Sequence, residues 1–194
     1  MAASKAYYTT STLSKYANMY SSAQVTAKFA ATLQAHVNTI LKNISTYRMI
    51  AYYSKVPWQL VACLHMREST LNFTRHLHEG SPLTGRTRFV PIGYPRKGPA
   101  NGKVYSFVES AVDALVTVKE LHKWTDWSVA GMLYIAELYN GAGYIKNNRS
   151  NPYLWSGTQH YTGGKYVRDG VYSSSAIDGQ LGVAVLLKKL LEYV

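Results

Sequence analysis

A block rich in glycine and proline, between residues 74 and 102, constrains the fold of this chain more than any other feature. Proline lacks the backbone N–H that a helix interior needs, and both residue types favour turns, so no long helix is expected to cross the block. Within it, the alternation Thr87-Arg88-Phe89-Val90 predicts one edge of a small β-hairpin. The block contains Gly80, Pro82, Gly85, Pro91, Gly93, Pro95, Gly98, Pro99 and Gly102.

On both sides of this block, apolar residues recur at three- and four-residue steps, which is typical of helices. Residues 23–47 predict a long helix, and a break at residues 54–57 separates it from the next one. The same periodicity marks residues 107–118 and 129–136, and a last helix is expected over residues 175–193. The sequence therefore predicts an α+β fold, mainly α, with a helical core and a small β-hairpin lobe.

The chain has 194 residues, of which 47% are hydrophobic and 16% are charged, as expected for a globular protein with a substantial core. Residues 1–22 are polar, rich in Ser, Thr and Tyr, and without a clear period. They are expected to form a flexible N-terminal leader. Residues 23–194 contain no repeat and no linker, so they are expected to form a single domain.

Nothing in the sequence predicts export or membrane insertion. No apolar run approaches the roughly 20 residues that a membrane span needs, and the N-terminus lacks the continuous hydrophobic segment of a secretory signal. Cys63 is the only cysteine, so no intrachain disulfide is possible. These features favour synthesis in a reducing cytoplasm.

The net charge of +11 predicts attraction to polyanions. Nucleic acid is one candidate, and the anionic polymers of the bacterial cell wall are another. The 17 tyrosines and four tryptophans fit either partner, because aromatic faces stack on sugars as well as on bases. Charge and composition alone do not choose between these partners.

Residues 57–73 combine a helical pattern with a carboxylate at its end. Pro57 suits the first turn of a helix, and Leu60, Leu64 and Glu68 then follow at four-residue steps on one face. Burial favours the neutral form of a carboxyl group, which is what a general acid needs near neutral pH. The alternative is a glutamate at a helix end that turns to water.

Two motifs resemble those of a known enzyme superfamily. Glu68-Ser69-Thr70-Leu71-Asn72 resembles the E-S-x-x-N-like motif at the end of a core helix in goose-type lysozymes and lytic transglycosylases. Tyr139-Asn140-Gly141-Ala142-Gly143 resembles their A-Y-N-x-G motif, which closes over the cleft. Phage and bacterial lysozyme-like endolysins share further patches, so that the resemblance covers roughly residues 45–190. These patches are Pro57-Trp58, the loop of residues 76–87, and residues 150–170 with Pro152-Tyr153-Leu154-Trp155.

This resemblance implies a lysozyme-like fold in which the hairpin lobe walls a substrate cleft. It also implies a muramidase that cleaves peptidoglycan between N-acetylmuramic acid and N-acetylglucosamine and so lyses bacteria. A lytic transglycosylase, which forms anhydro products, is the alternative. The implied protein is a monomer, made in the host cytoplasm, that acts on the wall after release. The pair Lys188-Lys189 favours at most a weak attraction to anionic membranes or wall polymers.

The resemblance assigns the chemistry to a small set of residues. Glu68 is expected to be the acid that protonates the leaving oxygen, and Glu79 is the best candidate for the second carboxylate. Thr84 and Thr87 are expected to hold the attacking water, as a threonine does in some inverting phage lysozymes. The related endolysins often have aspartate where this chain has Ser81, and asparagine where it has Glu79. The second carboxylate has therefore moved by two residues, or its role is absent.

Further residues are expected around the sugar. In the relatives, the residues matching Tyr139 and Asn140 lie near the acid and shape the sugar site. Tyr153 and Trp155 are candidates for stacking on a sugar, with the core as the alternative.

Three polar residues are expected beside this site. Ser69 and Asn72 are expected to order the backbone at the helix end, on the substrate side. Glu137 lies two residues before Tyr139, on the opposite side of its helix turn, and is expected to pair with an arginine.

Two rival hypotheses follow from other features. The histidines His65, His76 and His78, together with Cys63, suggest a zinc site, but no H-E-x-x-H or C-x-x-C spacing supports it. No metal or other cofactor is therefore expected. The second rival is a non-catalytic, basic binder of cell wall or nucleic acid, although no nucleic-acid-binding motif is present. Binding to peptidoglycan and to DNA across a salt series would distinguish the two partners.

Overall fold

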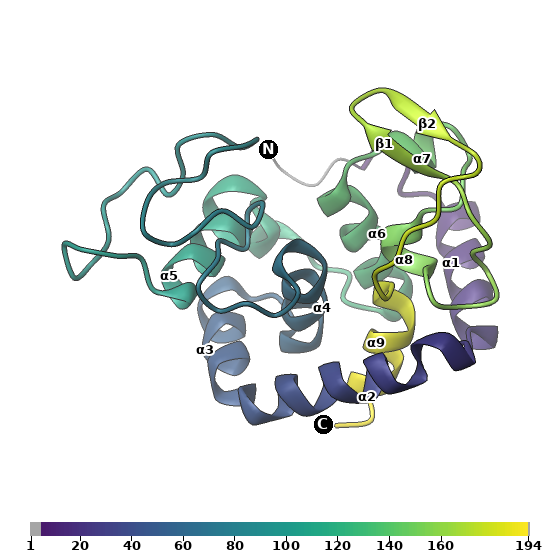
Figure 1. Ribbon diagram of the computed structural model, residues 1–194, viewed down its shortest axis with the longest axis horizontal. Helices are drawn as coiled ribbons and strands as arrows, with labels where there is room; N and C mark the ends of the chain where they lie inside the picture. Colours follow the sequence, from purple (N-terminus) through teal and green to yellow (C-terminus); the bar gives the residue numbers. More distant parts are fainter. Residues whose placement is uncertain (1–4, 194) are drawn as a thin grey trace. The chain divides into compact units, whose positions relative to one another are not determined.

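The computed structural model describes residues 5–193, which are mainly helical with one small antiparallel sheet (Figure 1). This confirms the predicted class, α+β and mainly α. The chain divides into two compact units. Among the described residues, the first unit contains Thr39–Thr125, and the second contains residues 5–38 and 126–193. The expectation of a single domain over residues 23–194 stays a prediction.

The first unit is built around three α-helices. They are α3 (Ile44–Ser54), α4 (Trp58–Ser69) and α5 (Phe107–Val112), and α3 packs against both of the others (Figure 1). A π-helical segment η1 (Asp113–Val118) continues α5, and the short 3₁₀ helix η2 (Leu121–Lys123) follows it. Helix α2 (Ala27–Lys42) begins in the second unit and ends in the first.

The long helix predicted over residues 23–47 is two helices. Helix α2 ends at Lys42 and α3 begins at Ile44, with Asn43 between them at φ −113° and ψ 20°. The side-chain amide of Asn43 donates to the carbonyl of Thr39 at 2.9 Å, so asparagine satisfies a carbonyl that the helix end leaves open. The break predicted at residues 54–57 is confirmed, because α3 ends at Ser54 and α4 starts directly after Pro57.

The β-hairpin predicted around residues 87–90 is wrong. Residues 74–102 form turns and a single isolated bridge between Arg75 and Pro82. The N–H of Thr87 donates to the carbonyl of Tyr94 at 2.7 Å, and the N–H of Gly93 donates to the carbonyl of Thr87 at 2.9 Å. These bonds close a compact loop, and Pro91 inside it has no N–H to give to a ladder.

The second unit contains the remaining helices and the sheet. Helix α1 (Thr10–Ser22) packs against α6 (Val129–Asn140) and α9 (Val183–Leu190). Helix α8 (Pro152–Trp155) packs against α6 and α9, and α7 (Gly143–Lys146) follows α6 (Figure 1). Strand β1 (Lys165–Arg168) pairs antiparallel with β2 (Val171–Ser173), so that Lys165 lies opposite Ser173.

Residues 10–22 form a helix where the sequence predicted part of a flexible leader. Thr9 caps α1 by accepting the N–H of Thr12 at 3.2 Å, and Tyr16 is buried. The hydroxyl of Tyr16 donates to Glu137 at 2.9 Å. Tyrosine supplies the buried contact here, which explains why aliphatic periodicity did not reveal the helix. Residues 1–4 of the expected leader lie outside the described residues.

The last helix is shorter than residues 175–193, because it starts only at Val183. A Cβ atom on Gly182 would lie 2.4 Å from the carbonyl oxygen of Leu154, so the backbone passes this point without room for a side chain. The N–H of Gly182 donates to the carbonyl of Ser156 at 2.7 Å, which anchors the chain in an extended conformation before α9. Within residues 5–193, no helix is both long enough and apolar enough to cross a bilayer.

Candidate functional site

An open pocket of about 570 Å³ lies at the C-terminal end of α4, entirely within the first unit. Its volume is in the range of small-ligand sites, about 300–1,000 Å³. Its walls come from the end of the helix and from the loop that follows. They are formed by Glu68, Ser69, Thr70, Arg75, Glu79, Gly80, Ser81, Pro82, Arg88 and Phe89.

Helix α4 places Glu68 in this pocket. Leu60 and Leu64 are completely buried, as their spacing predicted, and they fix the orientation of the helix in the core. Thr70 and Leu71 both have left-handed backbones, at φ 53° and 61°, so the chain leaves the helix axis abruptly after Ser69. Glu68 is therefore half-buried in the last turn, where the pocket opens.

The loop of residues 74–83 brings Glu79 to the same pocket. Gly80 has φ +82°, and a Cβ atom on it would lie 2.7 Å from the backbone oxygen of Glu68. Arg75 donates from Nη1 to the carbonyl of Gly80 at 2.8 Å and so holds the turn. The close approach of Gly80 to the backbone of Glu68 shows that the loop folds back to the end of α4.

The carboxylate of Glu79 is held by Ser81. Its Oε1 accepts the N–H of Ser81 at 3.1 Å, and its Oε2 accepts the Ser81 hydroxyl at 2.8 Å. Ser81 is buried, and its Oγ also accepts the N–H of Arg88 at 3.2 Å. A carboxylate has about four acceptor positions, so these two bonds leave capacity for a water or a substrate group. Glu79 is thus a fixed side chain rather than a freely rotating surface charge.

Lys119 lies outside the pocket lining, but it interacts electrostatically with Glu68, which the sequence did not predict. Burial lowers the pKa of the Lys119 ammonium group, and the negative charge of Glu68 opposes this change. The N–H of Lys119 donates to the carbonyl of Ala114, five residues earlier, at 3.0 Å. This π-helical spacing shifts Lys119 from the face that an α-helix would give it. No α-helical or strand pattern in the sequence signals such a shift.

The pocket wall carries positive charge as well as carboxylates. Arg75 and Arg88 both line the pocket. Phe89 also lines it, with 70% of its surface exposed. The site therefore combines two carboxylates with cations that attract anionic groups and an open aromatic ring.

The two threonines expected to hold water do not line the pocket. Thr87 is buried, its Oγ1 accepts the N–H of Tyr94 at 2.9 Å, and its hydroxyl donates to the carbonyl of Pro91. Its hydroxyl therefore holds the loop of residues 87–94 closed. Thr84 is exposed.

Ser69 and Asn72 are neighbours, since the N–H of Asn72 donates to the carbonyl of Ser69 at 3.1 Å, but only Ser69 lines the pocket. The hydroxyl of Ser69 lies 3.4 Å from the carbonyl of His65. The side-chain oxygen of Asn72 accepts the N–H and the hydroxyl of Thr74, at 2.9 and 2.7 Å. Asn72 is exposed outside the pocket lining, and it orders the backbone after the helix, as predicted.

Tyr139, Asn140, Tyr153 and Trp155 all belong to the second unit. Tyr139 is buried near the end of α6, whereas Asn140 is exposed and donates to Asn151 at 3.4 Å. The proximity of Tyr139 and Asn140 to Glu68 stays a prediction.

The two aromatic residues of α8 are almost fully buried, with exposures of 3% for Tyr153 and 2% for Trp155. The Trp155 ring lies 6.3 Å from the ring of Tyr16 and 5.7 Å from that of His160, measured between centroids. Both residues therefore belong to the core, which was the alternative to a role in stacking on a sugar.

Glu137 is buried in the second unit and accepts a hydrogen bond from Tyr16, where the sequence predicted an arginine partner. Burial raises the pKa of Glu137, and hydrogen bonds from Tyr16 and Asn151 oppose this increase. It lines a smaller pocket of about 300 Å³ together with Lys15, Arg149 and other residues of that unit. These hydrogen bonds give Glu137 a structural role that links α1 to α6.

The histidines form internal hydrogen bonds. His76 contacts Ser110 through Nδ1 at 2.8 Å and the carbonyl of Gly85 through Nε2 at 2.7 Å, and His78 contacts Asp113 at 2.9 Å. Ser110, His78 and Asp113 resemble a catalytic triad in composition, but Ser110 is completely buried and no substrate reaches it. These contacts attach the loop to α5 and η1.

The zinc hypothesis is not supported within residues 5–193. In this part of the chain, no three His, Cys, Asp or Glu side chains are placed to hold a metal ion. His65 Nδ1 and the Tyr47 hydroxyl form a hydrogen bond of 2.8 Å in the core. Burial raises the pKa of the Cys63 thiol. Burial therefore favours the neutral form of this thiol.

Comparison with protein-family models, with curated proteins and with solved structures gives no match for this chain. The residues and geometry of the pocket at the end of α4 are therefore the basis for proposing a function.

Proposed function

We propose that this protein is a peptidoglycan-degrading glycoside hydrolase, a muramidase that cleaves between N-acetylmuramic acid and N-acetylglucosamine. The observation that carries the proposal is the presence of Glu68 and Glu79 in one open pocket. Glycoside hydrolysis commonly uses one carboxyl group as an acid and a second one for water or for the sugar carbon. Glu68 is also the first residue of the motif that resembles the E-S-x-x-N-like motif of goose-type lysozymes and lytic transglycosylases.

In the proposed mechanism, Glu68 donates a proton to the glycosidic oxygen as the bond to the leaving sugar breaks. Glu79, oriented by Ser81, accepts a proton from the water that attacks the sugar. Lys119 stabilises the carboxylate that Glu68 becomes after it has given up its proton. Arg75 and Arg88 attract the anionic polymer to the pocket.

The proposal includes a lysozyme-like fold with one change from the sequence expectation. The irregular loop of residues 74–89, rather than a β-hairpin, forms the wall beside the helix that carries the acid. The glycan site extends along this wall in the first unit. The proposed protein acts as a monomer on the cell wall after release from the cytoplasm of its host.

A lytic transglycosylase is the second candidate, because the hydrogen bonds between Glu79 and Ser81 also suit a purely structural carboxylate. In that reaction a hydroxyl group of the substrate attacks, and one acid is sufficient. Mass spectrometry of fragments released from purified peptidoglycan tests both candidates. Hydrolysis predicts ordinary reducing ends, transglycosylation predicts anhydro ends, and the absence of any cleaved glycan would contradict an enzyme of either kind.

The substitution Glu79→Gln separates the two mechanisms further. If Glu79 activates water, its loss should reduce the rate by about 10²–10⁴-fold, the usual contribution of a positioned acid or base. The matched control is Glu120→Gln, which changes a glutamate of the same unit outside the pocket. A Glu79→Gln protein with normal turnover and anhydro products would show that the enzyme is a transglycosylase.

A further inference from the structure

Residues 87–94 form a closed loop in the first unit, and its two ends are bonded to each other. The N–H of Thr87 donates to the carbonyl of Tyr94 at 2.7 Å, and the N–H of Tyr94 donates to Thr87 Oγ1 at 2.9 Å. Gly93 donates to the carbonyl of Thr87 at 2.9 Å. Only 3% of Thr87 is exposed, so the base of the loop is embedded in the unit. The base therefore fixes which residues the loop presents to solvent.

The closed loop presents apolar side chains to water. The exposed fractions are 70% for Phe89, 84% for Val90 and 64% for Ile92, and Pro91 lies between the last two. Single apolar residues on a surface are normal, but a continuous group of them marks an interaction site. The hydrogen bonds at the base of the loop hold its backbone in place. Among the described residues, Phe89, Val90 and Ile92 are therefore held on the surface and not packed into the core.

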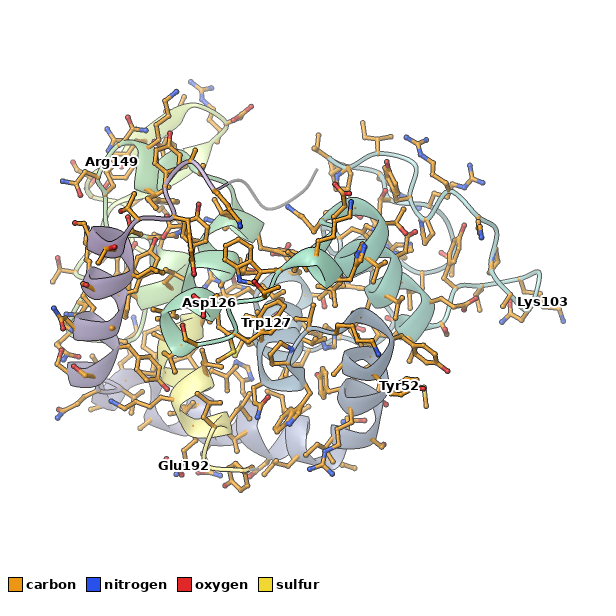
Figure 2. All side chains as sticks on the ribbon, turned by 180° about the vertical axis from the view of Figure 1, so that it is seen from behind. Tyr52, Lys103, Asp126, Trp127, Arg149 and Glu192 are labelled. Carbon is orange, nitrogen blue, oxygen red and sulfur yellow. The ribbon has the colours of Figure 1, made fainter. Side chains whose placement is uncertain are left out.

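Positive charges surround the base of the loop. Arg86 donates to the carbonyl of Arg96 at 2.9 Å, and the Arg96 guanidinium lies 4.4 Å from the centroid of the Tyr94 ring. Arg88 and Lys97 are also exposed beside it. Figure 2 shows Lys103, the residue directly after the block of residues 74–102, on a segment that extends away from the helices of the first unit. The sequence from Gly80 to Val108 contains no aspartate or glutamate, so no carboxylate of this segment offsets these cations.

We propose that the closed loop docks the protein on an anionic lipid bilayer, with Val90 and Ile92 entering the boundary of the acyl chains. The aliphatic side chains decide between possible partners. Valine and isoleucine offer no hydrogen bond to sugar hydroxyls and no flat ring for stacking on a sugar or a base. Transfer from water to hydrocarbon is favourable for them, and the arginines and lysines then meet anionic head groups. This inference is independent of the proposed glycosidase activity.

Vesicle binding tests the proposal on the full-length protein. We expect co-sedimentation with vesicles of phosphatidylglycerol and phosphatidylcholine, much weaker binding to pure phosphatidylcholine, and a decline as salt concentration rises. The double variant Val90→Ser with Ile92→Ser should lower the partition coefficient on anionic vesicles at least tenfold. The matched control, Val167→Ser with Ile177→Ser, removes one valine and one isoleucine that are 52% and 62% exposed in the second unit. This control should bind like the wild type, and thermal melts should show all three proteins folded.

Two results would overturn the proposal. One is a wild-type protein that binds anionic and neutral vesicles equally, and the other is a Val90→Ser, Ile92→Ser protein that binds anionic vesicles like the wild type. Cleavage of purified peptidoglycan, which contains no bilayer, separates this proposal from the enzymatic one. The loop variant should retain the wild-type cleavage rate. Loss of cleavage with intact vesicle binding would place the loop in glycan recognition and would also overturn the docking proposal.

Discussion

Glu68 and Glu79 depend on different neighbours for their positions. Glu68 follows two completely buried leucines of α4, and the charge of Lys119 acts on it. Glu79 is fixed by two hydrogen bonds from Ser81. The sequence suggested that burial alone would control the proton on Glu68, whereas the structure adds a nearby ammonium group. We therefore expect Lys119 to influence the pH at which the proposed acid works.

Replacing Lys119 with methionine should move the alkaline limb of the pH–rate profile to higher pH. The ammonium favours the ionised carboxylate of Glu68, so its removal lets the acid keep its proton at higher pH. Lys119→Arg preserves the charge and is the matched control, for which the limb should stay in place. An unchanged limb in Lys119→Met would show that this charge does not control the proposed acid. Initial rates of peptidoglycan cleavage between pH 4 and 9 would measure the effect.

At the scale of elements, the return of the 74–83 loop to the end of α4 assembles the pocket. Gly80 makes this possible. Its φ of +82° favours glycine, and a Cβ atom at this position would lie 2.7 Å from the backbone carbonyl oxygen of Glu68. Gly80→Ala should therefore move the loop, reduce the cleavage rate and lower the free energy of unfolding by roughly 1–3 kcal/mol. Gly98 has no atom within 4 Å of an added Cβ, so Gly98→Ala is the control. Equal rates and equal stability for the two variants would contradict this role of Gly80.

Features carried by short, regular patterns could be predicted from the sequence. The boundary before α4, its buried leucines and the carboxylate at its end all followed from spacing and proline chemistry. The alternation of residues 87–90 suggested a β-hairpin that does not form. The hydrogen bonds of Thr87 with residues 93 and 94 determine the local structure instead, and they leave no pattern in the sequence. Helix α1 was missed because its buried contact is a tyrosine paired with Glu137. Lys119 was missed because a π-helical register leaves no period in the sequence.

At the scale of the whole molecule, the core of the first unit makes stability depend on pH. Burial lowers the pKa of His65 from 6.5 to about 4, and its ring lies among Tyr47, Phe73 and Phe107. Because the folded pKa is below the unfolded value, the unfolded chain binds more protons between these two pH values. The stabilisation is therefore complete above about pH 6.5 and decreases as pH falls toward 4.

His65→Gln should weaken this dependence, because glutamine can still bond with Tyr47 but does not titrate. Between pH 7 and pH 4, the wild type should lose about 3 kcal/mol more of its unfolding free energy than His65→Gln. His122→Gln changes an exposed histidine and should behave like the wild type. Denaturant titrations at several pH values measure these differences. Parallel losses in the wild type and in His65→Gln would contradict the buried, neutral state of His65.

The central claim is that Glu68 supplies the proton for glycan cleavage, and the turnover of Glu68→Gln on purified peptidoglycan tests it most directly. Glutamine keeps the size and the packing of the side chain but carries no transferable proton. The account predicts that the rate falls by at least about 10²-fold, while binding to the wall and the thermal melt stay like those of the wild type. Glu120→Gln, outside the pocket, should retain full activity. A folded Glu68→Gln protein that cleaves peptidoglycan at the wild-type rate would contradict the account.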